Sequence, residues 1–152
     1  MKTTETVELK SLHKKRDRQV TISEFDYPRL KELLIDARQG SDDPPLYISD
    51  LESELQRASI VPPEQIPPYV VTMNTQVGLT NNKSGKRATF TIVFPANANS
   101  DDGKLSIFSE LGTAILGYTV GDTIEFDSPD GHESHRINMI CFQPEAAKQF
   151  DL

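Results

Sequence analysis

The sequence lacks tryptophan and contains a single cysteine, Cys141, among its 152 residues. One cysteine cannot form an intramolecular disulfide or a zinc site with several thiolate ligands, so a disulfide-stabilised scaffold and a zinc finger are both excluded. No apolar run approaches the roughly 20 residues that a membrane-spanning helix needs. Residues 1–6 contain no apolar core of a signal peptide. We therefore expect a cytoplasmic protein with no membrane partner.

Basic residues are fewer than acidic ones: the sequence contains 16 Lys and Arg and 23 Asp and Glu, which gives a formal net charge of -7. A protein that binds nucleic acid on its own usually relies on clustered cations that displace phosphate counterions. We therefore expect no direct sequence-specific contact with nucleic acid. Residues 1–21 are polar and without a clear period, which predicts a tail. Its basic run is either solvated or in contact with an anion; the cations are Lys14, Lys15, Arg16 and Arg18, interrupted by Asp17.

Residues 22–62 predict a hairpin of two helices. Apolar residues recur at helical spacing over residues 26–39, with Asp26 as the expected N-cap, Ser23 as a weaker candidate and Gly40 as the stop. A second apolar stripe covers roughly residues 45–60. The short loop between the stripes predicts that the helices run antiparallel. At 1.5 Å per residue, 14 helical residues span only about 20 Å, so the arm is short.

The remainder of the chain predicts a β-rich domain. Residues 63–68 are rich in proline, which ends the hairpin and predicts a stiff linker. From residue 69 to 152, alternating apolar residues and turn signals predict a five-stranded, mostly antiparallel sheet with one short helix at residues 111–116. The fold class is therefore α+β. The expected strands cover residues 76–80, 88–94, 105–107, 123–126 and 137–142.

Residues that carry chemistry are few. The phosphate-binding patterns GxxxxGK and GxGxxG are absent, so the common nucleotide-hydrolysing sites are unsupported. Cys141 lies among apolar residues of a predicted strand, which favours a buried structural thiol over a reactive one. His132 and His135 are three residues apart and point to opposite faces of a strand, so they cannot both bind one metal ion without a bulge. They either belong to a solvated hairpin or form a metal or pH-sensing site. Asp42 and Asp43 are either ordinary loop residues or a pair able to bind Mg²⁺.

Three motifs follow one another along the chain: VVTMN at residues 70–74, LSIFS at 105–109 with LGTAILG at 111–117 and GD at 121–122, and QPEAA at 143–147. Over residues 20–152 they make the sequence resemble the regulator of nucleoside diphosphate kinase family, which is related to the bacterial Gre-type transcript-cleavage factors. The resemblance implies a fold like that of FK506-binding proteins for residues 69–152. It also implies that the hairpin is an antiparallel coiled coil.

The resemblance implies a partner as well, the core enzyme of bacterial RNA polymerase near its secondary channel. In Gre-type factors the strand that leads into the short helix docks on the polymerase. Phe108 and Glu110 depart from the Gre-type pattern, which often has a polar or acidic residue and a proline there. The same residues could simply form a strand-to-helix turn. The docking residues that the resemblance implies are Ser106, Phe108, Ser109, Glu110 and Leu111.

Asp42 and Asp43 match the acidic pair at the tip of a Gre-type arm, but this arm is short. We therefore expect a non-enzymatic, monomeric regulator that occupies the channel entrance, competes with longer-armed factors and does not cleave transcripts efficiently. It needs no cofactor or resident metal. The alternatives are a Mg²⁺-assisted cleavage factor that uses the tip carboxylates, and a peptidyl-prolyl isomerase suggested by fold alone. Because no kinase site is visible, any effect on nucleoside diphosphate kinase is indirect.

Overall fold

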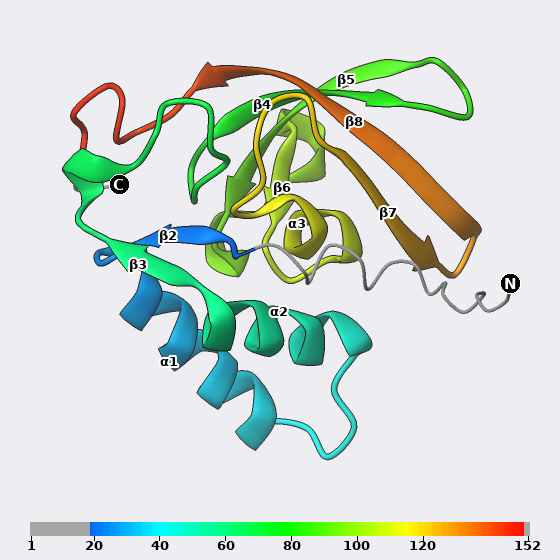
Figure 1. Ribbon diagram of the computed structural model, residues 1–152. Helices are drawn as coiled ribbons and strands as arrows, with labels where there is room; N and C mark the ends of the chain where they lie inside the picture. Colours follow the sequence, from blue (N-terminus) through cyan, green and yellow to red (C-terminus); the bar gives the residue numbers. More distant parts are fainter. Residues whose placement is uncertain (1–18, 151–152) are drawn as a thin grey trace, which may run out of the picture.

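A computed structural model describes residues 19–150 of the chain (Figure 1). The expected tail at residues 1–21, with its basic run at 14–18, lies outside the described residues up to residue 18. Helices and a curled sheet follow one another, which confirms the predicted α+β class. The main elements are β2 (Thr21–Ser23), α1 (Asp26–Gln39), α2 (Leu46–Arg57), β3 (Ser59–Val61), β4 (Gln76–Asn81), β5 (Arg87–Val93), β6 (Lys104–Ser106), α3 (Glu110–Ile115), β7 (Thr123–Ser128) and β8 (Gly131–Phe142).

The sheet has five strands in the order β6-β5-β4-β8-β7. Strand β4 is antiparallel to β5 and β8, β7 is antiparallel to β8, and β6 runs parallel to β5. This confirms the predicted mostly antiparallel sheet. Figure 1 shows the sheet curling around α3, with α2 and then α1 on the other side of α3. No helix among residues 19–150 is long and apolar enough to cross a membrane.

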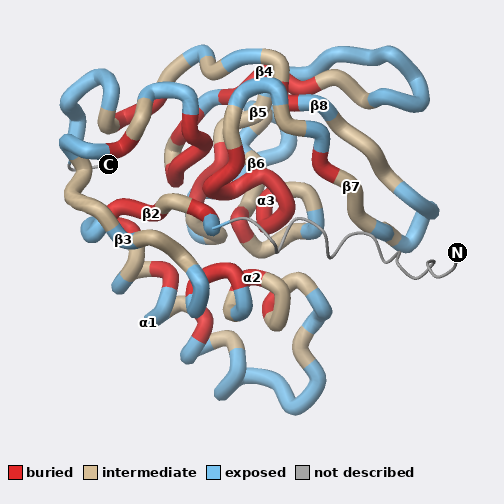
Figure 2. The backbone as a smooth tube through the Cα atoms, in the orientation of Figure 1, coloured by how far each residue is buried: buried red, intermediate tan, exposed pale blue. Residues whose placement is uncertain are grey.

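The helical hairpin is part of the hydrophobic core rather than a separate arm. Leu51 of α2 is 0% exposed and belongs to the same buried cluster as Ile107 and Ile115 beside the sheet. The Tyr47 ring lies 6.3 Å from the Phe108 ring, centroid to centroid. Figure 2 shows the buried segments concentrated in α3 and in the parts of the sheet and of α2 that face it. The base of the hairpin is therefore held against the sheet by burial.

Strands β2 and β3 form a parallel pair that we did not predict. Residues 58–60 were expected to continue the second helix, but α2 ends at Arg57 and Ala58 is already extended, with ψ 149°. The amide of Ser59 donates to the carbonyl of Val20 at 2.8 Å, so a contact from far along the chain replaces the next helical turn. Val20 is 1% exposed, so ordered packing begins before residue 21.

The start of α1 also differs from the prediction. Phe25 is the N-cap residue and Asp26 is the first residue of the helix, so the predicted capping role of Asp26 is wrong. The amide of Asp26 donates to Ser23 Oγ at 3.0 Å, which satisfies one of the free amides at the helix start. The side chain of Asp26 does not cap the helix and is buried instead.

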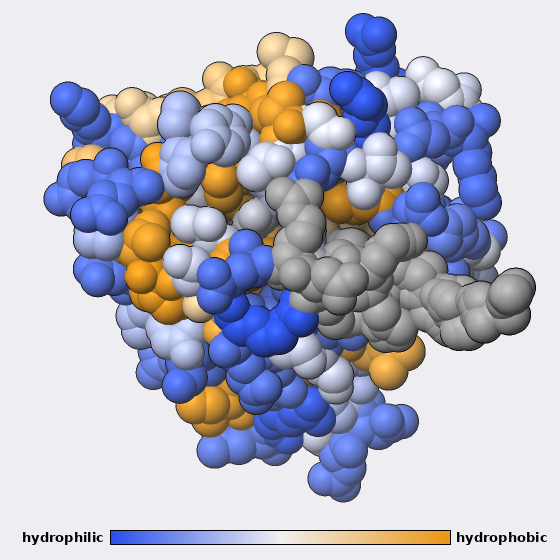
Figure 3. Space-filling view, in the orientation of Figure 1, coloured by the Kyte–Doolittle hydropathy of each residue, from blue (hydrophilic) through white to orange (hydrophobic). Residues whose placement is uncertain are grey.

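Cys141 is exposed, so the predicted burial of its thiol is wrong. The register between β4 and β8 shifts twice, between Gln76 and Val77 and between Gly78 and Leu79, which inserts extra residues into β8. Each bulge changes which side chains point inward, because side chains alternate along a strand. Met139 is 54% exposed on the outer face. Figure 3 shows hydrophobic residues along the upper edge of the molecule, over β4, β5 and β8.

Candidate functional site

The candidate docking residues form a turn between β6 and α3. Ser106 Oγ accepts a hydrogen bond from the amide of Phe108 at 2.9 Å. Ser109 Oγ donates to the carbonyl of Ser106 at 2.7 Å and accepts from the amide of Gly112 at 3.0 Å. Ser109 is therefore the N-cap of α3. Both hydroxyls form hydrogen bonds within the turn, as expected if these residues simply form a strand-to-helix turn.

The turn requires glycine at position 112. A Cβ atom on Gly112 would lie 2.3 Å from the carbonyl oxygen of Ser106, closer than real contacts allow. Thr113 Oγ1 donates to the carbonyl of Ile107 at 2.8 Å and ties the helix back to the strand. Glu110 is exposed, whereas Phe108 and Leu111 are half-buried. The turn is a rigid support from which Glu110 points into solvent.

A groove runs between α2, α3 and the β7–β8 hairpin, with a cavity of about 360 Å³. We call it the acidic groove. Sequence reasoning did not find it, because its carboxylates come from α2, α3 and β7 and no spacing rule connects them. They are Asp50, Glu54, Glu110, Glu125 and Asp127, and the apolar lining includes Leu46, Tyr47, Ala114, Phe126 and Pro129.

The two histidines of the last hairpin do not converge. His132 lies between two carboxylates of the acidic groove, with Nδ1 3.1 Å from Asp127 Oδ1 and Nε2 3.1 Å from Glu125 Oε1. Hydrogen bonds to Asp127 and Glu125 raise the pKa of His132 above its ordinary value. His135 instead contacts Glu133 at 2.9 Å. Among residues 19–150, no group of three or more His, Cys, Asp or Glu side chains is arranged to hold a metal ion.

The tip carboxylates Asp42 and Asp43 are both exposed, in the loop that connects α1 to α2. The amide of Asp43 donates to Ser41 Oγ at 3.2 Å, which shapes the loop. Behind the tip, Arg38 Nη2 lies 2.6 Å from Glu52 Oε1 and 3.0 Å from Ser49 Oγ, linking the end of α1 to α2. With 14 residues in α1, the arm is about 21 Å long at 1.5 Å per residue.

The first and third motifs meet at the end of the sheet, where the chain leaves β8. Gln143 Nε2 donates to the carbonyls of Pro67 at 2.8 Å and Val70 at 2.7 Å. Thr72 Oγ1 donates to Glu145 Oε1 at 2.7 Å. The glutamine and glutamate of QPEAA therefore fasten the proline-rich segment and the VVTMN motif to the end of the sheet.

The second motif reaches the same junction through the main chain. The amide of Val71 donates to the carbonyl of Tyr118 at 2.9 Å, and the amide of Gly117 donates to the carbonyl of Val71 at 2.8 Å. All three motifs that carry the family resemblance are thus neighbours in space, and they join the segment that follows the hairpin to the sheet part.

Asp26 is buried in this region, with 3% of its surface exposed. Burial, and next the nearby charge of Glu145, raises the pKa of Asp26 from its usual 3.8 to about 7. Arg29 opposes the shift from 3.5 Å, and its guanidinium stacks 4.1 Å above the ring of Phe94. Sequence reasoning missed this carboxyl as a buried group because its polar type and its position at a helix start suggested a cap.

Two family models match the chain. The model described as the N-terminus of Rnk covers residues 18–61, and that of the C-terminal domain of the transcription elongation factors GreA and GreB covers residues 66–141. The chain belongs to the Rnk/GreA-like family of transcription factors. The predicted family is therefore confirmed, and its two models meet where the hairpin joins the sheet.

Individual relatives agree with this assignment. The regulator of nucleoside diphosphate kinase of Escherichia coli K12 is 35% identical over 133 residues, which cover 86% of this chain and 95% of the relative. The transcription elongation factor GreA of Chlorobium phaeobacteroides DSM 266 is 32% identical over 119 residues, 78% of this chain and 69% of the relative. A solved GreA/GreB structure from Nitrosomonas europaea, 37% identical, superposes with a TM-score of 0.69 and covers 82% of this chain and 100% of that one. The relatives are regulators and elongation factors by name.

Proposed function

We propose that this protein is a non-enzymatic transcription regulator that binds the core enzyme of bacterial RNA polymerase at the entrance of the secondary channel. The observation that carries the proposal is the contact between Tyr47 and Phe108, which fixes the hairpin beside the turn from β6 to α3. A factor that docks through the turn would thereby present its hairpin in one orientation. The protein acts as a cytoplasmic monomer, with an antiparallel coiled coil and a domain like FK506-binding proteins.

Within the docking turn the residues have different tasks. Ser106 and Ser109 shape the main chain, since their hydroxyls bond inside the turn. Glu110 is exposed at the start of α3 and meets the partner directly, and the outer edges of Phe108 and Leu111 add apolar contact. A basic surface on the polymerase suits Glu110, because an exposed carboxylate favours a cationic partner.

The short arm sets the mode of action. Its base is buried in the core, so only the segment near Asp42 and Asp43 extends freely from the body. The protein therefore occupies the channel entrance and excludes longer-armed factors, while its own carboxylates stay short of the catalytic centre. Transcript cleavage is accordingly inefficient, and the protein needs no cofactor of its own.

Binding to purified core polymerase at low salt tests the proposal. We expect the full chain to co-migrate with the enzyme and to be displaced by a Gre-type factor. The variant Glu110→Arg should bind several-fold less tightly, because it reverses the charge at the contact. Glu64→Arg, which changes an exposed glutamate of the proline-rich segment, serves as the matched control. Absence of binding at micromolar protein would overturn the proposal.

The exposure of Asp42 and Asp43 at the tip favours one second candidate, a true transcript-cleavage factor. That function predicts release of short RNA from backtracked complexes when the protein is added with Mg²⁺. The double variant Asp42→Asn with Asp43→Asn should abolish the release, whereas Asp101→Asn with Asp102→Asn in an exposed turn of the sheet part should not. Cleavage that survives the tip substitutions excludes these carboxylates as the metal pair.

A further inference from the structure

We propose that the basic segment at residues 14–18 binds the acidic groove of its own chain and covers Glu110. The occupant is thus a part of this protein that lies outside the described residues, and the site is the groove between α2, α3 and the β7–β8 hairpin. Charge, reach and the shape of the lining argue for this occupant.

Charge is divided unequally along the chain. Residues 1–18 contain six Lys and Arg against three Asp and Glu, a net charge of +3. The other residues contain ten basic and twenty acidic residues, a net charge of -10, which together with +3 accounts for the total of -7. Five carboxylates line the acidic groove, and no lysine or arginine is found among the described residues that line it. The basic segment and this groove are therefore complementary in charge.

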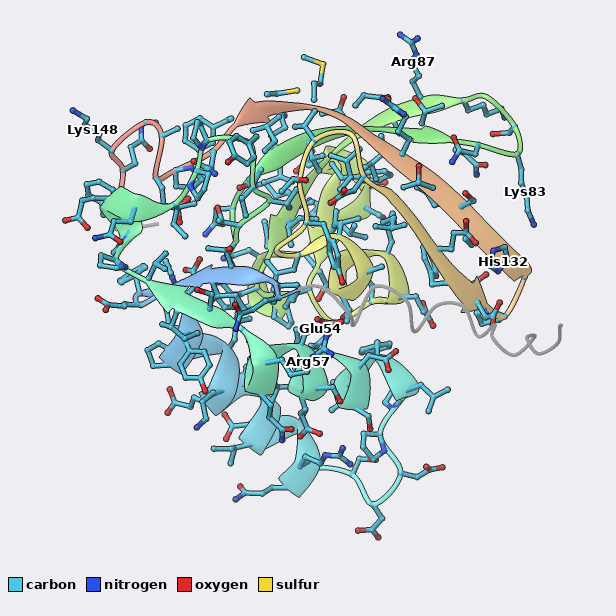
Figure 4. All side chains as sticks on the ribbon, in the orientation of Figure 1. Glu54, Arg57, Lys83, Arg87, His132 and Lys148 are labelled. Atoms are coloured by element: carbon cyan, nitrogen blue, oxygen red, sulfur yellow. The ribbon has the colours of Figure 1, made fainter. Side chains whose placement is uncertain are left out.

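Two cationic groups of the described residues lie beside the carboxylates of the groove. Arg57 Nη2 lies 3.8 Å from Glu54 Oε1, and His132 lies between Glu125 and Asp127. Figure 4 shows Glu54 and Arg57 on α2 where it faces the sheet part, and His132 near the end of the β7–β8 hairpin.

The segment is tethered next to the groove. A Cβ atom on Gly117 would lie 2.5 Å from Val20 Cβ, so the described chain begins against the residue that follows α3. Glu110 and Ala114, on α3, line the groove. Helix α3 is about 9 Å long by its rise, whereas the four residues from Arg16 to Val20 span up to about 13 Å when extended. Residues 14–18 are therefore long enough to reach the groove lining on α3, at Glu110 and Ala114.

The lining suits lysine and arginine side chains. Tyr47, Ala114 and Phe126 provide apolar surface along which aliphatic stems can pack, while carboxylates receive the charged ends. A guanidinium can also form paired hydrogen bonds with a carboxylate. Because the segment belongs to the same chain, its effective concentration at the groove is of millimolar order, so even a weak interaction is populated.

Residues 14–17 of the segment lie before the region that the two family models match, which begins at residue 18. Binding in the groove would cover Glu110, which the docking proposal assigns to the polymerase contact. The segment would then act as an internal competitor of the partner. This last consequence rests on the proposed function, whereas binding of the segment to the groove does not.

Paramagnetic broadening in the full chain tests the binding. A spin label is placed at His13→Cys in a Cys141→Ser background, and backbone amide signals are compared with those of the same protein after Lys14→Glu, Lys15→Glu and Arg16→Glu. We expect the signals of Glu110, Thr113 and Ala114 to be roughly twofold weaker with the natural segment, and to recover in about 0.5 M salt, where the Debye length falls to a few ångströms.

A matched control changes the same number of cations elsewhere. Lys86, Arg87 and Lys148 are exposed, and Figure 4 shows Arg87 and Lys148 pointing away from the body of the protein. Their triple change to Glu should leave the broadening at α3 intact. Equal broadening with the natural and the charge-reversed segment would overturn the proposal, because tethering alone would then explain the effect. Broadening confined to another surface would overturn it as well.

A polymerase-binding experiment separates this inference from the docking proposal. The charge-reversed segment should raise the affinity of the full chain for core polymerase by about threefold or more, because it removes an internal competitor. If polymerase binds no variant while the broadening depends on the segment, the docking proposal fails and the inference stands. If polymerase binds but the broadening is independent of segment charge, the inference fails alone.

Discussion

The two ends of helix α1 place the same kind of side chain in opposite settings. Asp26 at the start of the helix is 3% exposed, and its pKa is raised to about 7 by burial. Asp42 and Asp43, beyond the other end, are exposed in a loop. The base of the hairpin is therefore buried in the core, whereas its tip is exposed to solvent. Stability should depend on the base, and any chemistry of the arm on the tip.

The largest expected effect comes from the buried side of α2. Leu51→Ala should lower the free energy of unfolding by about 2–5 kcal/mol, because it opens a cavity at a side chain that is 0% exposed. Leu46→Ala on the same helix, where the side chain is 83% exposed, should change it by less than about 0.5 kcal/mol. Urea unfolding measures both. A separate, earlier transition of the hairpin in unmodified protein would contradict the view that its base is part of one core.

The next effect is a pH dependence from Asp26. Because its pKa is higher in the folded protein than its usual 3.8, the unfolded chain loses this proton first as pH rises. The contribution to stability is therefore complete below about pH 4 and lost as pH rises through about 7, by at most about 4 kcal/mol. Asp26→Asn should flatten this part of the stability profile, whereas Asp36→Asn on the exposed face of α1 should not. An unchanged profile for Asp26→Asn would show that Asp26 does not carry the effect.

A smaller effect is expected at the glycine of the turn between β6 and α3. Gly112→Ala should destabilise the protein by about 1–3 kcal/mol, because its Cβ would lie 2.3 Å from the carbonyl oxygen of Ser106. Gly40→Ala near the tip places its Cβ 3.5 Å from the nearest atom, the carbonyl oxygen of Asp36, and should be nearly neutral. Thermal unfolding of both variants measures the contrast. Equal losses would mean that the turn can relax around a methyl group.

The smallest effect on stability belongs to the tip itself. Asp42→Asn with Asp43→Asn should change the free energy of unfolding by less than about 0.5 kcal/mol, because both side chains are exposed. Binding to core polymerase should be retained, since the docking residues are untouched. Urea unfolding and the polymerase-binding assay check the two expectations. A marked loss of stability would show that the tip is more tightly integrated than its exposure indicates.

The sequence predicts regular elements well where local patterns decide them. The apolar stripe over residues 26–39 and the stop at Gly40 match α1, and β4, β5 and α3 lie within a residue or two of the predicted segments. Here the period of the side chains and the turn residues act over a few neighbouring positions. The mixed class and a mostly antiparallel sheet could be predicted for the same reason, whereas the parallel pairing of β6 with β5 could not.

Contacts between distant segments could not be predicted. Strands β2 and β3 have three residues each and exist because Val20 and Ser59 meet across the hairpin. Cys141 was predicted to be buried on the assumption of strict alternation, which the bulges in β8 break. The acidic groove escaped notice because Asp50, Glu110 and Asp127 are neighbours only in the folded chain. For Ser106 and Ser109, the sequence allowed a strand-to-helix turn, but the hydrogen bonds of the two hydroxyls within that turn could not be predicted.

The separation between base and tip has a consequence for the length of the arm. The side chains that fix the hairpin in the core come from both helices, while residues 40–45 are mostly exposed. They are Leu30 and Leu34 of α1 and Ile48, Leu51 and Leu55 of α2. Whole helical turns could be inserted at residues 40–45 and would extend into solvent without disturbing any buried contact. The same core can therefore carry hairpins of different length, because the length of the arm and the packing of its base are set by different residues.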